Sequence, residues 1–263
     1  MRVRALVLKE FLDLQRNRGA LLPVALVMLL SLGMPFVITI GVPLATSQHL
    51  GEDPGLVRVS ASAGPHGELS ADARVQFFLF QQFLMLFLMT PITAAMALAA
   101  HAIVGEKQAR TLEPLLATPV TTGELLIAKV LGALLPTSAI SFAGVALYFA
   151  GIAMLGAPGV LRAMITPRTA LLVFVIGPAV ALVSLQAAIV ISSRVNDART
   201  AQQFGVLIIV PLAAVLVAQF VGTLWLSTGA LGFIGLGLFG VWMLLALLSV
   251  AVFDRESILT RWR

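Results

Sequence analysis

Long stretches without any Asp, Glu, Lys or Arg most strongly limit the folds open to this chain. An α-helix needs about 20 mostly apolar residues to cross the hydrocarbon core of a bilayer. Each of the first four stretches fits one such helix, and the last is long enough for two. We therefore predict an all-α integral membrane protein. The stretches run over 19–51, 75–105, 130–161, 169–193 and 200–253.

The prediction is a single transmembrane domain over 1–263, in which 46–74 forms an external loop with turns and a short helix near 69–74. Composition agrees, because only 11% of the residues are charged, against about 25% in soluble domains. Prolines inside the spans are expected either to kink helices or to be ordinary residues of membrane helices. The six predicted spans are about 20–45, 75–104, 127–154, 169–192, 201–222 and 231–253.

The distribution of basic residues predicts the orientation in the membrane. Six spans place both chain ends on one side, and only four of the 17 Lys and Arg residues fall on the other side. Because cytoplasmic loops carry the excess of basic residues, we expect both ends and the 105–129 segment in the cytoplasm. The net charge of +5 then reflects this topology and anionic headgroups, and no basic soluble module for nucleic acid is present. The four residues are Arg58, Arg74, Arg162 and Arg168.

Residues 1–18 have the pattern of a basic amphipathic helix. Val3, Phe11 and Leu14 share one face, with Lys9 and Arg16 on the opposite face. Such a helix next to a span should lie in the headgroup plane, so the bilayer is its first partner. Glu10 falls within the apolar arc. Its side chain is expected to form an ion pair with a neighbouring Arg, to snorkel toward the headgroups, or to contact a partner. The candidate interfacial residues are Lys9, Glu10, Arg16 and Arg18.

The sequence lacks the usual signatures of a catalytic site. It has no cysteine, none of its three lysines follows a glycine, and it has only three histidines, so thiol chemistry, a Walker A loop and an HExxH zinc site are excluded. We predict no catalytic, metal or cofactor-binding residue on this chain. The external carboxylates are predicted to be solvated and to have no His partner. They are Glu52, Asp53, Glu68 and Asp72.

Glutamines are the main polar residues within the predicted spans. In hydrocarbon, such side chains either form hydrogen bonds between helices or line a pathway. Both interpretations stay open. No Asp, Glu, Lys or Arg lies deep in a span, which disfavours an ion-coupled carrier, because such carriers usually place an ionisable group at the midplane. The candidate pathway residues are Gln82, Gln186, Gln203 and Gln219.

The charged segment GEKQARTLEPLLATPVTTGELLIAK, over 105–129, separates two long apolar stretches. Thr111 can cap a short helix whose first turn holds Glu113 and Pro114, and Pro119 would end it. Thr121-x-x-Glu124 is a capping box for the next span. We predict a short helix parallel to the membrane, which would move the second and third spans together; a connector with its leucines in lipid is the alternative. The segment's other distinctive residues are Glu106, Lys107, Arg110, Leu112, Leu115 and Leu116.

The same segment resembles the signature of the ABC-2 exporter permease family. That signature has an acidic-basic start, Thr-Leu-Glu-x-Leu-Leu, a Thr/Ser-Pro-Val/Ile step, a Glu, and a Lys that opens the next span. The chain departs from it at 108–110, where the family often has Glu, any residue and Gly. The matching residues are Glu106, Lys107, Thr111, Leu112, Glu113, Leu115, Leu116, Thr118, Pro119, Val120, Glu124 and Lys129.

The resemblance implies a type V exporter-like fold of six helices per subunit in a bacterial cytoplasmic membrane. It also implies pairing with a second copy or a paralogue, and two separate ATPase subunits that carry Mg-ATP. The short loop helix would then be a cytoplasmic coupling helix, seated in a cleft of the ATPase beside the N-terminal interfacial helix. Two other functions remain open, namely an ion-coupled secondary transporter and a non-transporting scaffold for an ATPase-dependent assembly system.

Overall fold

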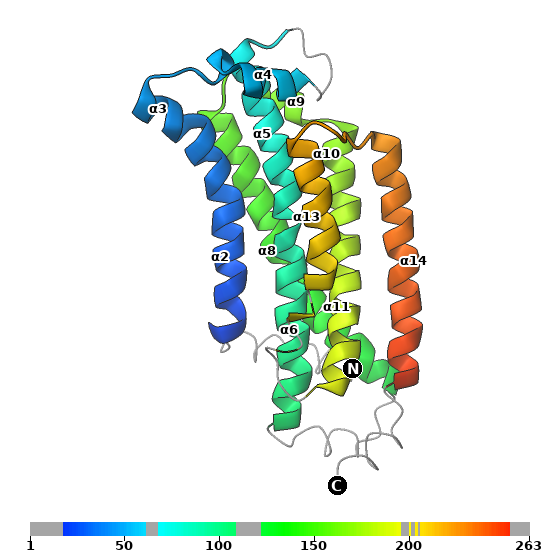
Figure 1. Cartoon of the computed structure of the whole chain (residues 1–263). Coiled ribbons are helices and arrows are strands. Elements are labelled where there is room, and N and C mark those ends of the chain that lie inside the picture. Colours follow the sequence, from blue (N-terminus) through cyan, green and yellow to red (C-terminus); the bar gives the residue numbers. More distant parts are fainter. Residues whose placement is uncertain are drawn as a thin grey trace.

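The computed structural model describes residues 18–61, 68–108, 122–195, 200, 203–204 and 206–252. Within these ranges the chain forms helices and no strands, which confirms the all-α prediction. Figure 1 shows long helices side by side in one bundle, with short helices gathered at one end. In chain order, the elements are α2 (Arg18–Phe36), the π-helix η1 (Val37–Gly41), α3 (Val42–Thr46), the 3-10 helix η2 (Leu50–Glu52), α4 (Pro54–Ser60), α5 (Ala71–Phe87), α6 (Met89–Gln108), α8 (Thr122–Leu155), α9 (Val160–Met164), α10 (Pro167–Leu171), the π-helix η4 (Leu172–Ile176), α11 (Gly177–Arg194), α13 (Val206–Phe220) and α14 (Thr228–Val252).

Five helical segments in the described ranges are long and apolar enough to cross a bilayer, so the chain is a multi-pass membrane protein. The span predicted at 201–222 corresponds to a shorter apolar helix, Ile209–Phe220, and part of that prediction lies outside the described residues. The five segments are Leu22–Thr46, Ala71–Ala100, Gly123–Leu155, Pro167–Ser192 and Thr228–Val250.

Prolines shape the spans by removing backbone donors and crowding the carbonyl four residues earlier. Before Pro91 the helix breaks at Leu88, whose N–H bonds back to the carbonyl of Met85, so the second span consists of α5 and α6. The wide turns of η4 precede Pro178 in the same way. Pro136 instead lies inside an unbroken α8. The expectation of local distortion therefore holds at some prolines only.

The second span is the centre of the bundle. Segment Ala71–Ala100 is mostly buried, whereas the first, third and last spans turn most of their surface outward. Helix α6 packs against α2, α8 and α11, and α11 also packs on α14. Small side chains allow these backbones to approach closely, which is how membrane helices gain packing energy. The small buried residues of α6 are Ala94, Ala95, Ala97, Ala99 and Ala100.

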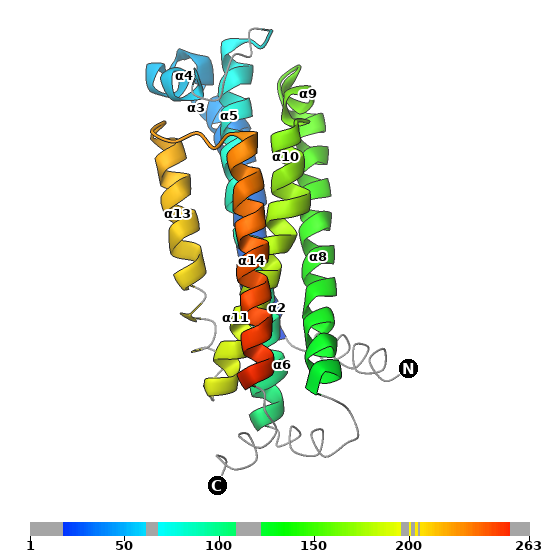
Figure 2. The ribbon, with the colours of Figure 1, turned by 90° about the vertical axis from the view of Figure 1, so that its right-hand side faces the viewer.

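The two ends of the bundle differ. Helices α2 and α8 begin, and α6 and α14 end, at the same end (Figures 1 and 2). We call it the basic end, because the predicted topology assigns most of the Lys and Arg residues to it. Helices α4 and α9 and the connection between α13 and α14 lie at the opposite end, called the loop end. The two helices that flank the 105–129 segment, α6 and α8, thus have their adjoining ends at the basic end.

The loop end is more ordered than the sequence analysis predicted. Helix α4 is capped by Asp53, whose Oδ1 accepts hydrogen bonds from the Gly55 and Leu56 amides at 2.7 and 3.1 Å. The Asp53-Pro54 pair is a helix-start signal in the sequence that the prediction of a loop left out. The short helix expected near 69–74 is not a separate element, because Ser70 caps α5 and the chain runs from there directly into the span.

The prediction that the external carboxylates have no His partner is wrong for Asp72. Its Oδ2 lies 3.4 Å from Nδ1 of His49, and its Oδ1 accepts a hydrogen bond from the Gly51 amide at 2.6 Å. The residues are far apart in the sequence, and the turn before η2 brings them together. These contacts attach η2 to the start of α5, and both side chains remain partly exposed, which is typical of a structural contact.

Candidate functional site

Most of the predicted coupling segment lies outside the described residues. This applies to Arg110, Thr111, Leu112, Glu113, Leu115, Leu116 and Pro119. The predicted interfacial helix also lies outside them, including Lys9, Glu10 and Arg16, and Arg18 is the first residue of α2. The structure therefore describes the helices that border these segments, and the coupling and interfacial assignments stay predictions.

The borders of the coupling segment belong to two helices that already touch. Glu106 and Lys107 lie in the last turn of α6, which continues past the predicted end of the span at 104. Glu124 is half-buried in the first turn of α8, and Lys129 is 2% exposed in the next turn. Since α6 and α8 pack on each other, a displacement of the segment between them would act on one connected pair of helices.

The four candidate pathway glutamines occupy different environments. Gln82 on α5 is completely buried, and its amide has no hydrogen-bond partner among the described residues. Gln186 on α11 is buried and donates to Oγ of Ser249 on α14. Gln203 is exposed. Gln219 on α13 is buried and belongs to a separate polar cluster at the loop end.

That cluster is built around Arg168, which the basic-residue distribution assigns to the external side. Its guanidinium donates from Nη2 to Oε1 of Gln219 at 3.0 Å and lies 3.7 Å from the centre of the Trp225 ring. Gln219 in turn donates from Nε2 to Sδ of Met85 at 3.0 Å. These contacts join α10, α13, α5 and the connection to α14. We call these residues, Arg168, Gln219 and Trp225, the Arg168 cluster.

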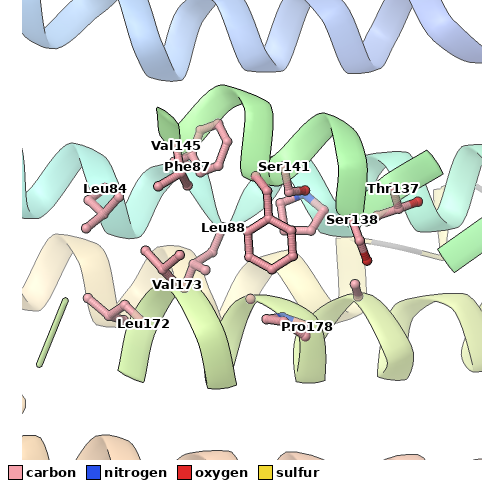
Figure 3. A pocket seen from close by; sticks show the side chains of 14 residues that line it. Leu84, Phe87, Leu88, Thr137, Ser138, Ser141, Val145, Leu172, Val173 and Pro178 are labelled. Carbon is pink, nitrogen blue, oxygen red and sulfur yellow. The ribbon is translucent and has the colours of Figure 1, made fainter. Parts of the chain in front are cut away.

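A mostly apolar pocket opens between α8 and the helices on either side of it (Figure 3). Its space, including the open mouth, is about 450 Å³. Phe87, Leu88 and Pro178 line it, and Thr137, Ser138 and Ser141 of α8 add hydroxyl groups. Thr137 and Ser141 have no hydrogen-bond partner for their hydroxyls among the described residues. None of the four candidate glutamines lines this pocket.

Comparison with known families decides the identity. The family described as ABC-2 family transporter protein matches residues 4–231, which include the 105–129 segment and every helix from α2 to α13. The chain belongs to the ABC-2 transporter family. The resemblance deduced from the 105–129 segment is thereby confirmed at the level of the family. A comparison of this ABC-2 permease with curated proteins found no match.

The sequence alone contained little that would reveal the Arg168 cluster of the permease. Arg168 follows Pro167 at the start of a predicted span, where a basic residue is normally interfacial. Gln219 and Trp225 lie more than fifty positions further along the chain, and only the packing of α10 against α14 and of α13 against α5 brings them near. Trp225 before the last span was the only available signal, since Trp is enriched at membrane interfaces.

Replacement of Gln186 by Leu should weaken the contact between α11 and α14 of the permease. The substitution leaves Ser249 without the Gln186 amide, and hydrogen bonds between membrane helices contribute about 0.6 kcal/mol on average and up to roughly 1.7. Thermal unfolding of the purified variant in detergent should show this loss. Gln203→Leu is the matched control, because Gln203 is exposed. Equal melting temperatures of the two variants would show that the Gln186–Ser249 bond is energetically unimportant.

Proposed function

We propose that this ABC-2 permease is the membrane subunit of an exporter that moves its substrate out of the cytoplasm. Membership of the ABC-2 transporter family supports this role. ATP would be hydrolysed by separate nucleotide-binding subunits, since none of the three lysines follows a glycine as a Walker A loop requires. Mg-ATP would bind to those partners, and a second copy or a paralogue would complete the membrane part.

The packing of α6 on α8, the two helices that border the 105–129 segment, is the observation that carries the proposal. When the ATPase subunits close on ATP, they would push a short coupling helix formed by this segment. The push would reach α6 directly, and α6 is part of the central span. The break at Leu88 offers a place where α6 can tilt relative to α5. This tilt would open a path to the outside beside the central span.

The proposed location is a bacterial cytoplasmic membrane, with both chain ends and the coupling segment in the cytoplasm. The excess of basic residues in the segments that border one end supports this orientation. Among the candidate pathway residues, Gln82 is the one we assign to the transport path, because its buried amide has no partner among the described residues and it lies on the central span. The hydrogen bonds of Gln186 and Gln219 favour a structural role for both.

Leu115→Asp tests the coupling proposal. A charge on the apolar face of the coupling helix would be buried in the ATPase cleft, and loss of a hot-spot residue at the centre of an interface costs about 2 kcal/mol or more. We expect permease-stimulated ATP hydrolysis in proteoliposomes to fall by about 10-fold or more, with normal membrane insertion. Glu113→Ala should lower the same activity to a smaller extent.

Two control variants accompany this test. Leu115→Met keeps the apolar face, and Glu68→Ala removes an exposed carboxylate at the loop end; both should leave the stimulated hydrolysis unchanged. Wild-type hydrolysis in Leu115→Asp and Glu113→Ala would refute a coupling role for the segment. Transport that continues on an ion gradient without any ATPase would instead establish a secondary carrier, and ATPase binding without stimulated hydrolysis would establish a scaffold.

A further inference from the structure

Arg168 is buried in surroundings that satisfy only part of its hydrogen-bonding capacity. Only 9% of the residue is exposed, and within the described ranges its one hydrogen bond runs from Nη2 to Gln219. The Nε and Nη1 atoms of the guanidinium have no acceptor among the described residues. A guanidinium is always charged and carries five N–H donors, so several donors point into buried space without an acceptor.

The described part of the chain also provides no negative charge for Arg168. At the loop end, Asp72 contacts the Gly51 amide and His49, and Asp53 caps α4. Glu52 and Glu68 are exposed, and no described carboxylate forms an ion pair with the guanidinium. The Trp225 ring attracts the cation through its π-face, but a ring accepts no strong hydrogen bond. An unpaired buried charge is costly, and in a membrane protein it usually marks a functional site.

The position of the Arg168 cluster indicates the side from which a ligand would approach. Arg168 is the second residue of α10, which begins at the loop end beside the connection between α13 and α14 (Figure 1). Residues 221–224 of that connection are exposed, and Trp225 is half-buried. The neighbouring Ile165 is 71% exposed, as expected at the boundary between headgroups and hydrocarbon. The Trp225 ring thus covers one face of the guanidinium and is itself half-buried next to this exposed connection.

We propose that the Arg168 cluster binds an anionic group, a phosphate or a carboxylate, at the loop end of the bundle. Oxygen atoms of the anion would accept hydrogen bonds from Nε and Nη1, while Gln219 holds Nη2 and Trp225 covers the cation. Charge-assisted hydrogen bonds of this kind are roughly twice as strong as neutral ones. The anion can belong to a lipid headgroup or to a soluble solute. This proposal needs no ATPase and is independent of the exporter proposal.

The first experiment uses the unmodified full-length protein in detergent. Dioctanoyl phosphatidylglycerol and dioctanoylglycerol have the same chains, and only the former has a phosphate. Their dissociation constants can be measured from the change in tryptophan fluorescence, to which Trp225 contributes, or from the melting temperature. We expect the phosphate to tighten binding by about 10-fold. Equal dissociation constants for the two compounds would overturn the proposal without any variant.

The second experiment compares two arginines at the same end of the bundle. Arg168→Gln should weaken phosphatidylglycerol binding by about 10-fold, and Arg168→Lys by less, because the ammonium keeps the charge but loses the planar donors. Arg162→Gln is the matched control, since Arg162 is exposed on α9, and it should bind within about 2-fold of the wild type.

Stability and binding are measured separately in these variants. If Arg168→Gln melts at a lower temperature but binds phosphatidylglycerol like the wild type, Arg168 is only structural and the proposal fails. If Arg168→Gln does not fold, Arg168→Lys takes its place. An anion site is refuted if Arg168→Lys binds phosphatidylglycerol as tightly as the wild type does and the wild-type protein binds the two lipids equally.

Competition identifies the source of the anion. Glycerol 3-phosphate carries the anionic group without acyl chains. Displacement of bound phosphatidylglycerol by millimolar glycerol 3-phosphate in the wild type, and not in Arg168→Gln, would support a site for a soluble anionic solute. Tight binding of phosphatidylglycerol that glycerol 3-phosphate does not displace would support a lipid headgroup site.

Discussion

Replacement of Tyr148 by Ala is expected to lower the free energy of unfolding by about 3 kcal/mol. Tyr148 on α8 is 2% exposed, and its ring lies 5.7 Å from the ring of Phe36 and 5.8 Å from that of Phe80. Its hydroxyl donates to the Phe80 carbonyl at 2.8 Å. Lipid chains are as apolar as these rings, so the loss comes from packing contacts that a cavity cannot replace.

Two substitutions separate the contributions in this test. Tyr148→Phe removes only the hydroxyl and should cost about 1 kcal/mol, the range of hydrogen bonds in membrane proteins. Leu147→Ala changes the neighbouring residue, which is 62% exposed, and should have little effect. Thermal unfolding in detergent gives all three values. If Leu147→Ala destabilises the protein as much as Tyr148→Ala, the described contact between α2, α5 and α8 is incorrect.

Replacement of Gly151 by Leu should separate α8 from α2 and destabilise the protein by about 2 kcal/mol or more, because overpacking typically costs 1–3. A Cβ atom at Gly151 would lie 2.6 Å from Cζ of Phe36 and 3.0 Å from its Cε1. The Phe36 ring is itself held by the rings of Phe80 and Tyr148, so it has little room to move. The measurement is the melting temperature together with the fraction of monodisperse protein after solubilisation.

Gly237→Leu on α14 is the matched control, because a Cβ there meets nothing within 4 Å. The double variant Gly151→Leu with Phe36→Ala should recover part of the stability relative to the sum of the two single changes, since the smaller side chain makes space. Additive losses in the double variant would show that the two residues do not meet. Comparable instability of Gly237→Leu would indicate a general effect of Leu in these helices.

Much of the helical framework could be predicted, because charge-free stretches of sufficient length have few alternatives to spanning helices in lipid. The predicted 127–154 span, for example, lies within α8 (Thr122–Leu155). The 201–222 prediction is described only in part, because α13 covers Val206–Phe220 and residues 201–202 and 205 lie outside the described residues. The residue types and their spacing in the 105–129 segment were sufficient to identify the family, since both are local properties of the chain.

Only those parts of the candidate site that are formed by residues close together in the sequence could be predicted. Hydropathy could not distinguish the central α5–α6 span from the lipid-facing α14, because both contain an apolar window of similar hydropathy that is long enough to span and lipid does not select a polar outer face. The partners of Gln186 and Gln219 depend on which helix faces lie together. The Asp72–His49 contact was missed because a turn brings together residues that are far apart in the sequence.

The sequence by itself determined the membrane environment, the approximate helix positions, the family and the expected coupling segment. Each of these depends on local composition or on residues close together in the chain. Tertiary structure alone decided that Ala71–Ala100 is the buried centre and that Arg168 meets Gln219 and Trp225. The physical reason is that these contacts arise from close packing of helices distant in sequence, and apolar composition does not encode which faces touch.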